Sequence, residues 1–84
     1  MIIVSQDKGK IINFDNMTRV YITFDEGDDV VCIRTETVDS LYEDLGYYKT
    51  EERTKEVLAE ITEFWKNGAM SDYKGFICYE MPED

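Results

Sequence analysis

Histidine is absent from this chain of 84 residues. Because histidine is the commonest general base near neutral pH and the commonest metal ligand, its absence removes the usual centre of hydrolytic and metal-dependent sites. The five glycines are isolated, so there is no glycine-rich phosphate-binding loop, and no serine lies in the strand-turn-helix setting of a hydrolase nucleophile. We therefore expect a protein without enzyme activity and without a cofactor.

Long hydrophobic runs are absent as well. The apolar start at residues 1–4 is too short for a signal peptide and is followed by the polar residues Ser5, Gln6 and Asp7. No stretch approaches the roughly 20 apolar residues of a transmembrane helix. These absences predict a cytoplasmic chain that does not enter a membrane.

Cysteine is rare, with only Cys32 and Cys78 in the chain. Each lies inside an apolar run, the two are far apart in sequence, and neither belongs to a C-x-x-C motif. We expect both thiols to be free and buried, as is usual in a reducing cytoplasm. A disulfide between two adjacent strands is the alternative.

Basic residues are few. Nine lysines and arginines stand against 19 aspartates and glutamates, which gives a net charge of −10. Residues 25–63 hold 13 of the acidic residues and four of the basic ones. An acidic field of this size opposes direct binding to nucleic acid or to an anionic membrane, and it permits a partner protein with a basic surface. Solubility alone is the alternative explanation of the charge.

The clearest structural pattern predicts a helix over residues 50–68. Thr50 is a suitable N-cap, two glutamates follow in the first turn, and Gly68 fits the position just past the end. The apolar residues recur on one stripe of a 3.6-residue repeat and should cover a sheet. They are Val57, Leu58, Ile61, Phe64 and Trp65. For Trp65, at the end of the stripe, we expect a core position, and a partly exposed anchor for a partner is the alternative.

The remainder of the chain indicates short strands. Runs rich in β-branched and aromatic residues predict strands at residues 2–4, 11–14, 17–24, 30–35, 45–48 and 76–79. Residues 36–44 lack a clear period and indicate a loop or an irregular edge strand. The order predicts a single α+β domain over residues 1–84, in which a small antiparallel sheet of about five strands is covered on one face by one helix near the C-terminus and a last strand follows. The other sheet face, which includes Tyr21, should be exposed or bound to something.

Two groups of carboxylates are candidates for the working surface. Four glutamates recur on the outer face of the predicted helix, roughly 5–6 Å apart along its axis, which is similar to the spacing of charges along a nucleic-acid strand. Acidic side chains also gather in the predicted turn at residues 25–29, which lacks the ligand spacing of an EF-hand, so we expect no metal there. The candidate residues are Glu52, Glu56, Glu60 and Glu63 in the helix and Asp25, Glu26, Asp28 and Asp29 in the turn. A solvated helix face and a plain acidic turn are the alternatives.

Three stretches of the chain carry a resemblance. They are IIVSQDKGKIINFDN at residues 2–16, LGYYKTEERTKEVLAEI at residues 45–61 and YEMPE at residues 79–83, together about half of the chain. These stretches resemble small uncharacterised proteins of phages and prophages of low-GC Gram-positive bacteria. The resemblance brings no catalytic residues. It implies an origin in a mobile element and a place in the cytoplasm of a bacterial host, where small acidic proteins of such elements often block a host or defence protein.

The sequence and the resemblance together favour a non-catalytic binding protein. We expect it to inhibit a nucleic-acid-handling host or defence protein by occupying a basic site, in the manner of anti-CRISPR inhibitors. The alternative is a self-associating accessory module, in which the exposed sheet face or an edge strand makes a homodimer.

Overall fold

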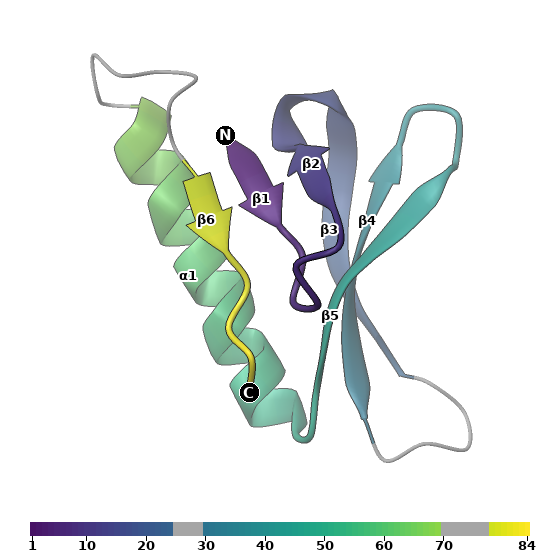
Figure 1. Cartoon of the computed structure of the whole chain (residues 1–84), viewed down its shortest axis with the longest axis vertical. Helices are drawn as coiled ribbons and strands as arrows, with labels where there is room; N and C mark the ends of the chain where they lie inside the picture. Colours follow the sequence, from purple (N-terminus) through teal and green to yellow (C-terminus); the bar gives the residue numbers. More distant parts are fainter. Residues whose placement is uncertain (25–29, 70–77) are drawn as a thin grey trace.

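The computed structural model describes residues 1–24, 30–69 and 78–84 of the chain (Figure 1). The elements in chain order are β1 (Ile2–Val4), β2 (Ile11–Asn13), the 3-10 turn η1 (Phe14–Asn16), β3 (Met17–Phe24), β4 (Val31–Thr37), β5 (Tyr42–Tyr48), α1 (Glu51–Ala69) and β6 (Cys78–Glu80). The predicted α+β class is confirmed, with one helix near the C-terminus followed by a last strand.

The six strands of the described residues form two sheets of three, in the orders β2-β1-β6 and β3-β4-β5. The sequence predicted one sheet of about five strands, and the division has two causes. The turn η1, where Asn13 accepts a hydrogen bond of 3.1 Å from the Asp15 amide, separates β2 from β3 and redirects the chain. In addition, β6 pairs in parallel with β1, which joins the two ends of the chain through a contact that no local pattern encodes.

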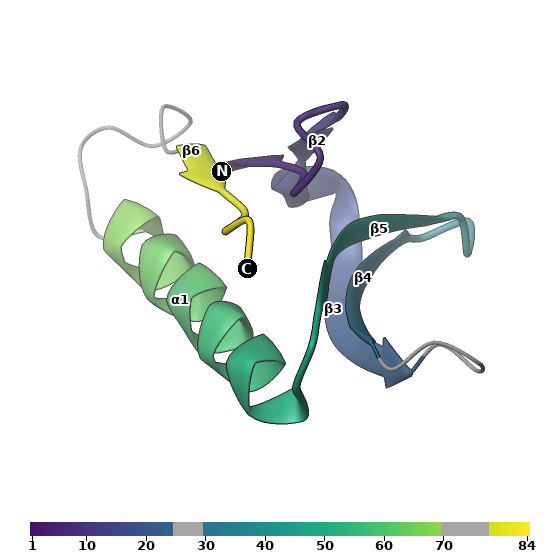
Figure 2. The same cartoon turned by 60° about the horizontal axis from the view of Figure 1, so that its bottom comes forward.

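Both sheets and the helix contribute to one core. Figure 2 shows α1 on one side and the β3–β4–β5 sheet on the other, with β1, β2 and β6 across one end between them. The buried apolar side chains come from all three parts. They are Met1, Ile3, Ile12, Ile33, Leu45, Tyr48, Val57, Ile61, Tyr79 and Met81. Burial of these side chains is what holds α1 against both sheets.

The helix begins where the sequence predicted. The Thr50 hydroxyl accepts a hydrogen bond of 3.1 Å from the Arg53 amide, as an N-cap should. The helix continues through Ala69, one residue beyond the predicted stop at Gly68. Its innermost line includes Thr54, which is fully buried although its side chain is polar. The Thr54 hydroxyl is satisfied inside the helix, because it donates to the Thr50 carbonyl at 2.7 Å.

The prediction that Phe64 and Trp65 belong to the core is wrong. Phe64 is 42% exposed and Trp65 is 53% exposed. The buried line of α1 runs through Thr54, Val57 and Ile61, and at 100° per residue the next two apolar positions fall on either side of it. Phe64 lies on one side and packs edge-on against Tyr79, with ring centroids 4.9 Å apart.

Strands β4 and β5 are longer than predicted and account for most of residues 36–44. A tight turn joins them, in which the Thr37 amide donates to the Leu41 carbonyl at 2.8 Å. Ser40 takes a positive φ of 64° in this turn. Residues other than glycine rarely adopt this conformation, so the sequence did not predict it. The predicted inward positions Val31 and Ile33 are both buried.

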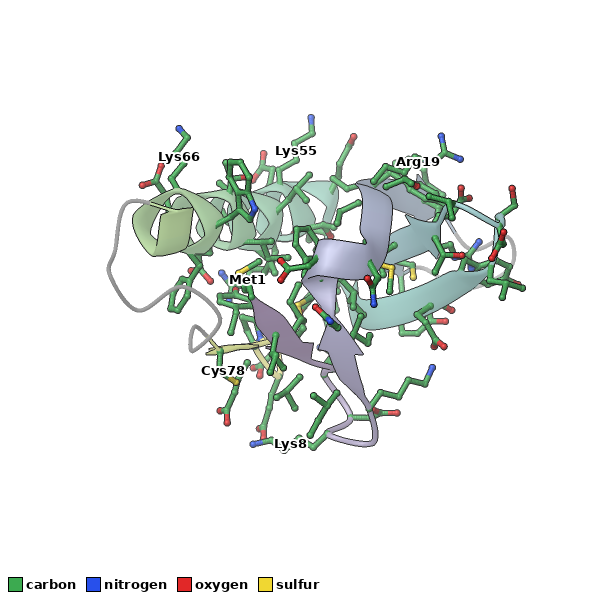
Figure 3. The ribbon with its side chains drawn as sticks, turned by 90° about the horizontal axis from the view of Figure 1, so that it is seen from above. Met1, Lys8, Arg19, Lys55, Lys66 and Cys78 are labelled. Carbon is green, nitrogen blue, oxygen red and sulfur yellow. The ribbon has the colours of Figure 1, made fainter. Side chains whose placement is uncertain are left out.

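The two cysteines differ in their exposure. Both are free; Cys32 is buried, as predicted, but Cys78 is exposed, so the prediction for Cys78 is wrong. In β6 the side chain of Tyr79 faces the core, and its neighbours in the strand therefore face solvent. Figure 3 shows Cys78 at the surface on this strand. The predicted start of the last strand, at residues 76–77, lies outside the described residues.

Candidate binding surfaces

The four glutamates predicted as a working surface, here called the acidic ridge (Glu52, Glu56, Glu60 and Glu63), are all exposed on α1. Their positions on the helix confirm the predicted placement on its outer face. The other predicted group, Asp25, Glu26, Asp28 and Asp29, lies outside the described residues.

One member of the acidic ridge, Glu60, accepts a hydrogen bond from a core residue. The Tyr79 hydroxyl donates to a carboxylate oxygen of Glu60 at 2.7 Å. Burial raises the pKa of Tyr79, and the hydrogen bond to Glu60 raises it further. Glu60 thus has a structural partner, whereas the other three ridge residues point only to solvent or to nearby surface cations.

Two other ridge residues have a cationic neighbour on the helix. Arg53 lies 3.1 Å from Glu56, and Lys66 lies 3.9 Å from Glu63. Exposed pairs of this kind contribute at most about 1 kcal/mol and are screened by salt. No described cation lies within ion-pair distance of Glu52. The carboxylates of Glu52, Glu56 and Glu63 therefore remain available to a stronger external cation.

A second candidate surface is the outer face of the β3–β4–β5 sheet, here called the open face. Alternation along the three strands brings arginine, tyrosine and carboxylate side chains together there, in the register given by the strand pairs. The residues of the open face are Arg19, Tyr21, Thr23, Cys32, Arg34, Glu36, Tyr42, Asp44 and Tyr47. The sequence placed Tyr21 on this face, which agrees with the structure.

Ion pairs and hydrogen bonds tie the open face together. Arg34 donates to Asp44 at 2.6 Å, and the Tyr47 hydroxyl donates to the same carboxylate at 2.5 Å. Burial alone would raise the pKa of Asp44, but these two hydrogen bonds outweigh it and hold the pKa below its usual value. Beneath them, burial raises the pKa of the Cys32 thiol to about 11, so Cys32 is a protonated, unreactive thiol near neutral pH.

The arginines of the open face also stack on tyrosines. Arg19 lies 4.7 Å from the centre of the Tyr21 ring, and Arg34 lies 4.2 Å from that of Tyr42. Arginine and tyrosine are enriched at protein–protein interfaces. On this face, however, the charges are already paired with one another, so the face offers contact area more than unpaired charge.

A third feature is an apolar groove between β3 and the C-terminal half of α1. It has a volume of about 290 Å³. Its lining residues are Phe14, Val20, Leu58, Ile61, Thr62 and Trp65. The volume falls at the lower limit of the roughly 300–1,000 Å³ that small-molecule sites occupy, so the groove suits a side chain better than a cofactor.

The described residues contain no group of three or more acidic or cysteine side chains placed to hold a metal ion. Within the same part of the chain, no helix is long and apolar enough to cross a membrane. The features that remain are surfaces for binding: the acidic ridge, the open face and the apolar groove.

Sequence reasoning missed most of the open face. Residues 36–44 showed no period, and a register shift between Ile33 and Arg34 places Asp44 opposite Arg34. A bulge of this kind leaves no trace in a hydrophobic pattern. The alternation of Arg19, Tyr21 and Thr23 in the sequence was the one available signal.

The chain was compared with known protein families, with curated proteins and with solved structures, and none of them matches it.

Proposed function

We propose that this chain is a non-catalytic acidic binding protein of phage or prophage origin, which inhibits a nucleic-acid-handling protein of its bacterial host by occupying a basic site. The target is a host or defence protein, as in anti-CRISPR inhibition. The observation that carries the proposal is the exposure of Glu52, Glu56 and Glu63 along one helix of a chain with a net charge of −10.

The length of the acidic ridge supports a nucleic-acid-like role. From Glu52 to Glu63 the helix rises roughly 16 Å, at about 1.5 Å per residue. One strand of a DNA duplex carries a charge about every 3.4 Å along its axis, so the ridge spans the length of about five nucleotides with four carboxylates. The helix holds its carboxylates in a fixed row, and a basic groove that binds a phosphate strand would meet a similar row of anions.

The weakness of the existing ion pairs also supports docking. Arg53 and Lys66 contact ridge carboxylates at the surface, where such pairs contribute little. An arginine of a partner that is desolvated on binding would form a shorter, charge-assisted hydrogen bond. Replacement of a surface cation by a partner's arginine would therefore sacrifice little stability at the ridge.

The experiment is affinity purification of the tagged chain from cells of its host, at about 0.1 M and 0.5 M salt. We expect the captured partner to be a basic, nucleic-acid-handling protein, and its capture to fall steeply at the higher salt because the Debye length shortens from about 10 Å. The ridge variant is Glu52→Gln, Glu56→Gln and Glu63→Gln together. Glu60 stays unchanged because Tyr79 binds it.

The matched control carries Asp39→Asn, Glu80→Gln and Glu83→Gln, three exposed carboxylates that do not belong to α1. It changes the net charge by the same amount, so only a specific role of the ridge makes the two triple variants differ. We expect the ridge variant to lose the partner and the control to keep it. A further variant, Asp28→Asn with Asp29→Asn, tests whether residues 25–29 belong to the same surface. Equal capture by the ridge variant and the wild type would overturn the proposal.

A self-associating accessory module is the second candidate function. It is favoured by one specific observation: among the described residues, the eight-residue strand β3 pairs on one side only.

A further inference from the structure

The outer edges of the two sheets are protected to different degrees. Strands β2 and β6 form the edges of the first sheet, and each has only three residues. Such short edges offer little backbone to another chain. The edges of the second sheet are β5 and β3, with seven and eight residues.

The β5 edge is occupied by Gln6. The Gln6 amide donates to the Leu45 carbonyl at 2.8 Å. Its side chain then bonds both backbone groups of Tyr47: the Tyr47 amide donates to Oε1 at 2.7 Å, and Nε2 donates to the Tyr47 carbonyl at 2.8 Å. Gln6 thereby takes the place of a neighbouring strand on this edge.

The β3 edge has no such cover in the part of the chain that the structure describes. Strand β3 pairs with β4 on one side, and among the described residues no backbone hydrogen bond is formed on its other side. The usual protections of an edge strand are nearly absent, because β3 contains no proline and no lysine, and its register shift lies at one end, between Met17 and Arg19. An edge of this length and composition is suited to accept another strand.

The apolar groove lies beside the same edge. Val20 of β3 forms one wall of it, and Leu58 and Trp65 of α1 form the opposite wall. A strand added to the β3 edge would direct its alternate side chains towards the groove, because successive side chains point to opposite faces of a sheet. Backbone pairing and a side-chain pocket are the two components of recognition by strand addition.

We propose that the occupant is a second copy of this chain. The β3 strands of the two copies pair antiparallel, so that the β3–β4–β5 sheet of one copy and that of the other form one six-stranded sheet. With Tyr21 opposite Tyr21 of the second copy, Val20 faces Ile22 of the second copy on the groove side. On the opposite face of the sheet, the open face, Arg19 lies opposite Thr23 of the second copy. The side chain of Ile22 from each copy then closes the groove of the other.

Charge favours a second copy at this edge. Figure 3 shows Arg19, Lys55 and Lys66 projecting from the same side of the molecule. Each of the three lies within 3.9 Å of a carboxylate, and these pairs reduce the net charge on this side. Two chains of net charge −10 repel one another least where their charges are balanced. Strand β3 itself carries a single charge, that of Arg19, so it enters the edge of another copy at little electrostatic cost.

The size of the contact predicts a weak dimer. An eight-residue strand is about 26 Å long at roughly 3.3 Å per residue. Pairing of two such strands with one side chain in each groove buries less than the roughly 800 Å² per partner of a stable complex. We therefore expect dissociation at micromolar concentrations, and a closed two-fold dimer in preference to a fibre, because β3 is the single long unoccupied edge among the described strands.

The test is sedimentation equilibrium of the purified chain over a range of concentrations at 0.1 M and 1 M salt. We expect a monomer–dimer equilibrium that shifts towards the dimer at high salt, because salt screens the repulsion between two acidic chains. The proposal gives the second candidate function, self-association, a defined edge. It is independent of the proposed inhibition, whose test requires a partner and is weakened by salt.

Two matched variants test the register. Thr23→Glu places a carboxylate opposite Arg19 of the second copy, and Thr23→Lys places a like charge there. We expect Thr23→Glu to tighten the dimer and Thr23→Lys to weaken it, each by about two- to tenfold. Net charge alone predicts the reverse order, since Thr23→Glu makes the chain more acidic. Circular dichroism and unfolding curves show whether both variants keep the fold.

A chain that stays monomeric up to about 0.5 mM in 1 M salt would overturn the proposal. This concentration is well above the micromolar range expected for weak transient contacts. If Thr23→Lys dimerised more tightly than Thr23→Glu, as net charge alone predicts, the pairing of Arg19 with Thr23 would be wrong, and the proposed register with it. Capture of an unrelated extended segment by a strictly monomeric chain would assign the edge to a foreign strand instead.

Discussion

At the scale of single residues, the innermost side chains of α1 carry most of the helix's contribution to stability. Ile61 is almost fully buried, and Ala59 lies on the exposed face of the same helix. We expect Ile61→Ala to lower the free energy of unfolding by about 2–4 kcal/mol, since it removes buried methylene groups and leaves a cavity. Ala59→Glu should lower it by less than about 1 kcal/mol. Denaturant midpoints give both values.

A third variant separates packing from surface contact. Trp65 is larger than Ile61, but more than half of its side chain is exposed. If burial determines how much a substitution lowers the free energy of unfolding, Trp65→Ala destabilises the chain less than Ile61→Ala does. The opposite order would mean that the helix faces the sheets through a different stripe.

The two thiols provide a second test at this scale. Cys78 is exposed, whereas Cys32 is buried and its pKa is raised to about 11. In the native chain at pH 8 we expect an alkylating reagent to label Cys78 quickly and Cys32 slowly, because the thiolate is the reactive form. After unfolding both should react quickly, and Cys78→Ser should leave only the slow native phase. Rapid native labelling of Cys32 would contradict the burial of β4.

At the scale of elements, the pair between β4 and β5 makes stability depend on pH. Hydrogen bonds from Arg34 and Tyr47 lower the pKa of Asp44 below its ordinary value of 3.8. A carboxyl group with a depressed pKa in the folded state stabilises fully above its unfolded pKa, and this contribution is lost as the pH falls towards the folded value. Asp44→Asn should therefore be less stable than the wild type at pH 7, and the difference should shrink below about pH 4.

The measurement is a set of urea midpoints for both proteins between pH 7 and pH 3. Asp39→Asn serves as the control, because it removes the same charge from the exposed turn between β4 and β5. Its difference from the wild type should be small at every pH. A difference between Asp44→Asn and the wild type that does not change with pH would rule out the ion pair as its source.

The elements differ in how far the sequence predicted them. For α1, the cap at Thr50, the apolar stripe and the acidic first turn all act within one segment, so local chemistry was enough to place the helix and its exposed glutamates. The division into two sheets depends on the parallel pairing of β1 with β6, between residues at opposite ends of the chain. Hydrophobic patterns state which residues are buried, and they do not state which strands are neighbours.

The candidate surfaces also differ in how far the sequence predicted them. Exposure of the acidic ridge follows from amphipathicity and was predictable. The open face depends on a bulge that moves Asp44 opposite Arg34, and the apolar groove depends on where α1 passes β3. Trp65 illustrates the limit, since an apolar residue at the end of a stripe belongs to the core only if the sheet beneath extends that far.

At the scale of the whole molecule, the acidic ridge and the β3 edge belong to different elements. The proposed β3 pairing uses no ridge residue, so a dimer would carry two ridges. Two linked sites raise the apparent affinity for a partner that carries two basic grooves, provided that the geometry allows both to bind at once. Self-association and docking to a basic site are therefore compatible, and opposite responses to salt distinguish them.

We propose that the acidic ridge occupies a site that otherwise binds nucleic acid. The most direct measurement is the binding of the purified partner to its own nucleic acid in the presence of increasing amounts of this chain. We expect the wild type and the control variant at Asp39, Glu80 and Glu83 to displace the nucleic acid. The variant at Glu52, Glu56 and Glu63 should not displace it. A complex in which the partner holds the chain and the nucleic acid at the same time, with unchanged affinity for each, would contradict the claim.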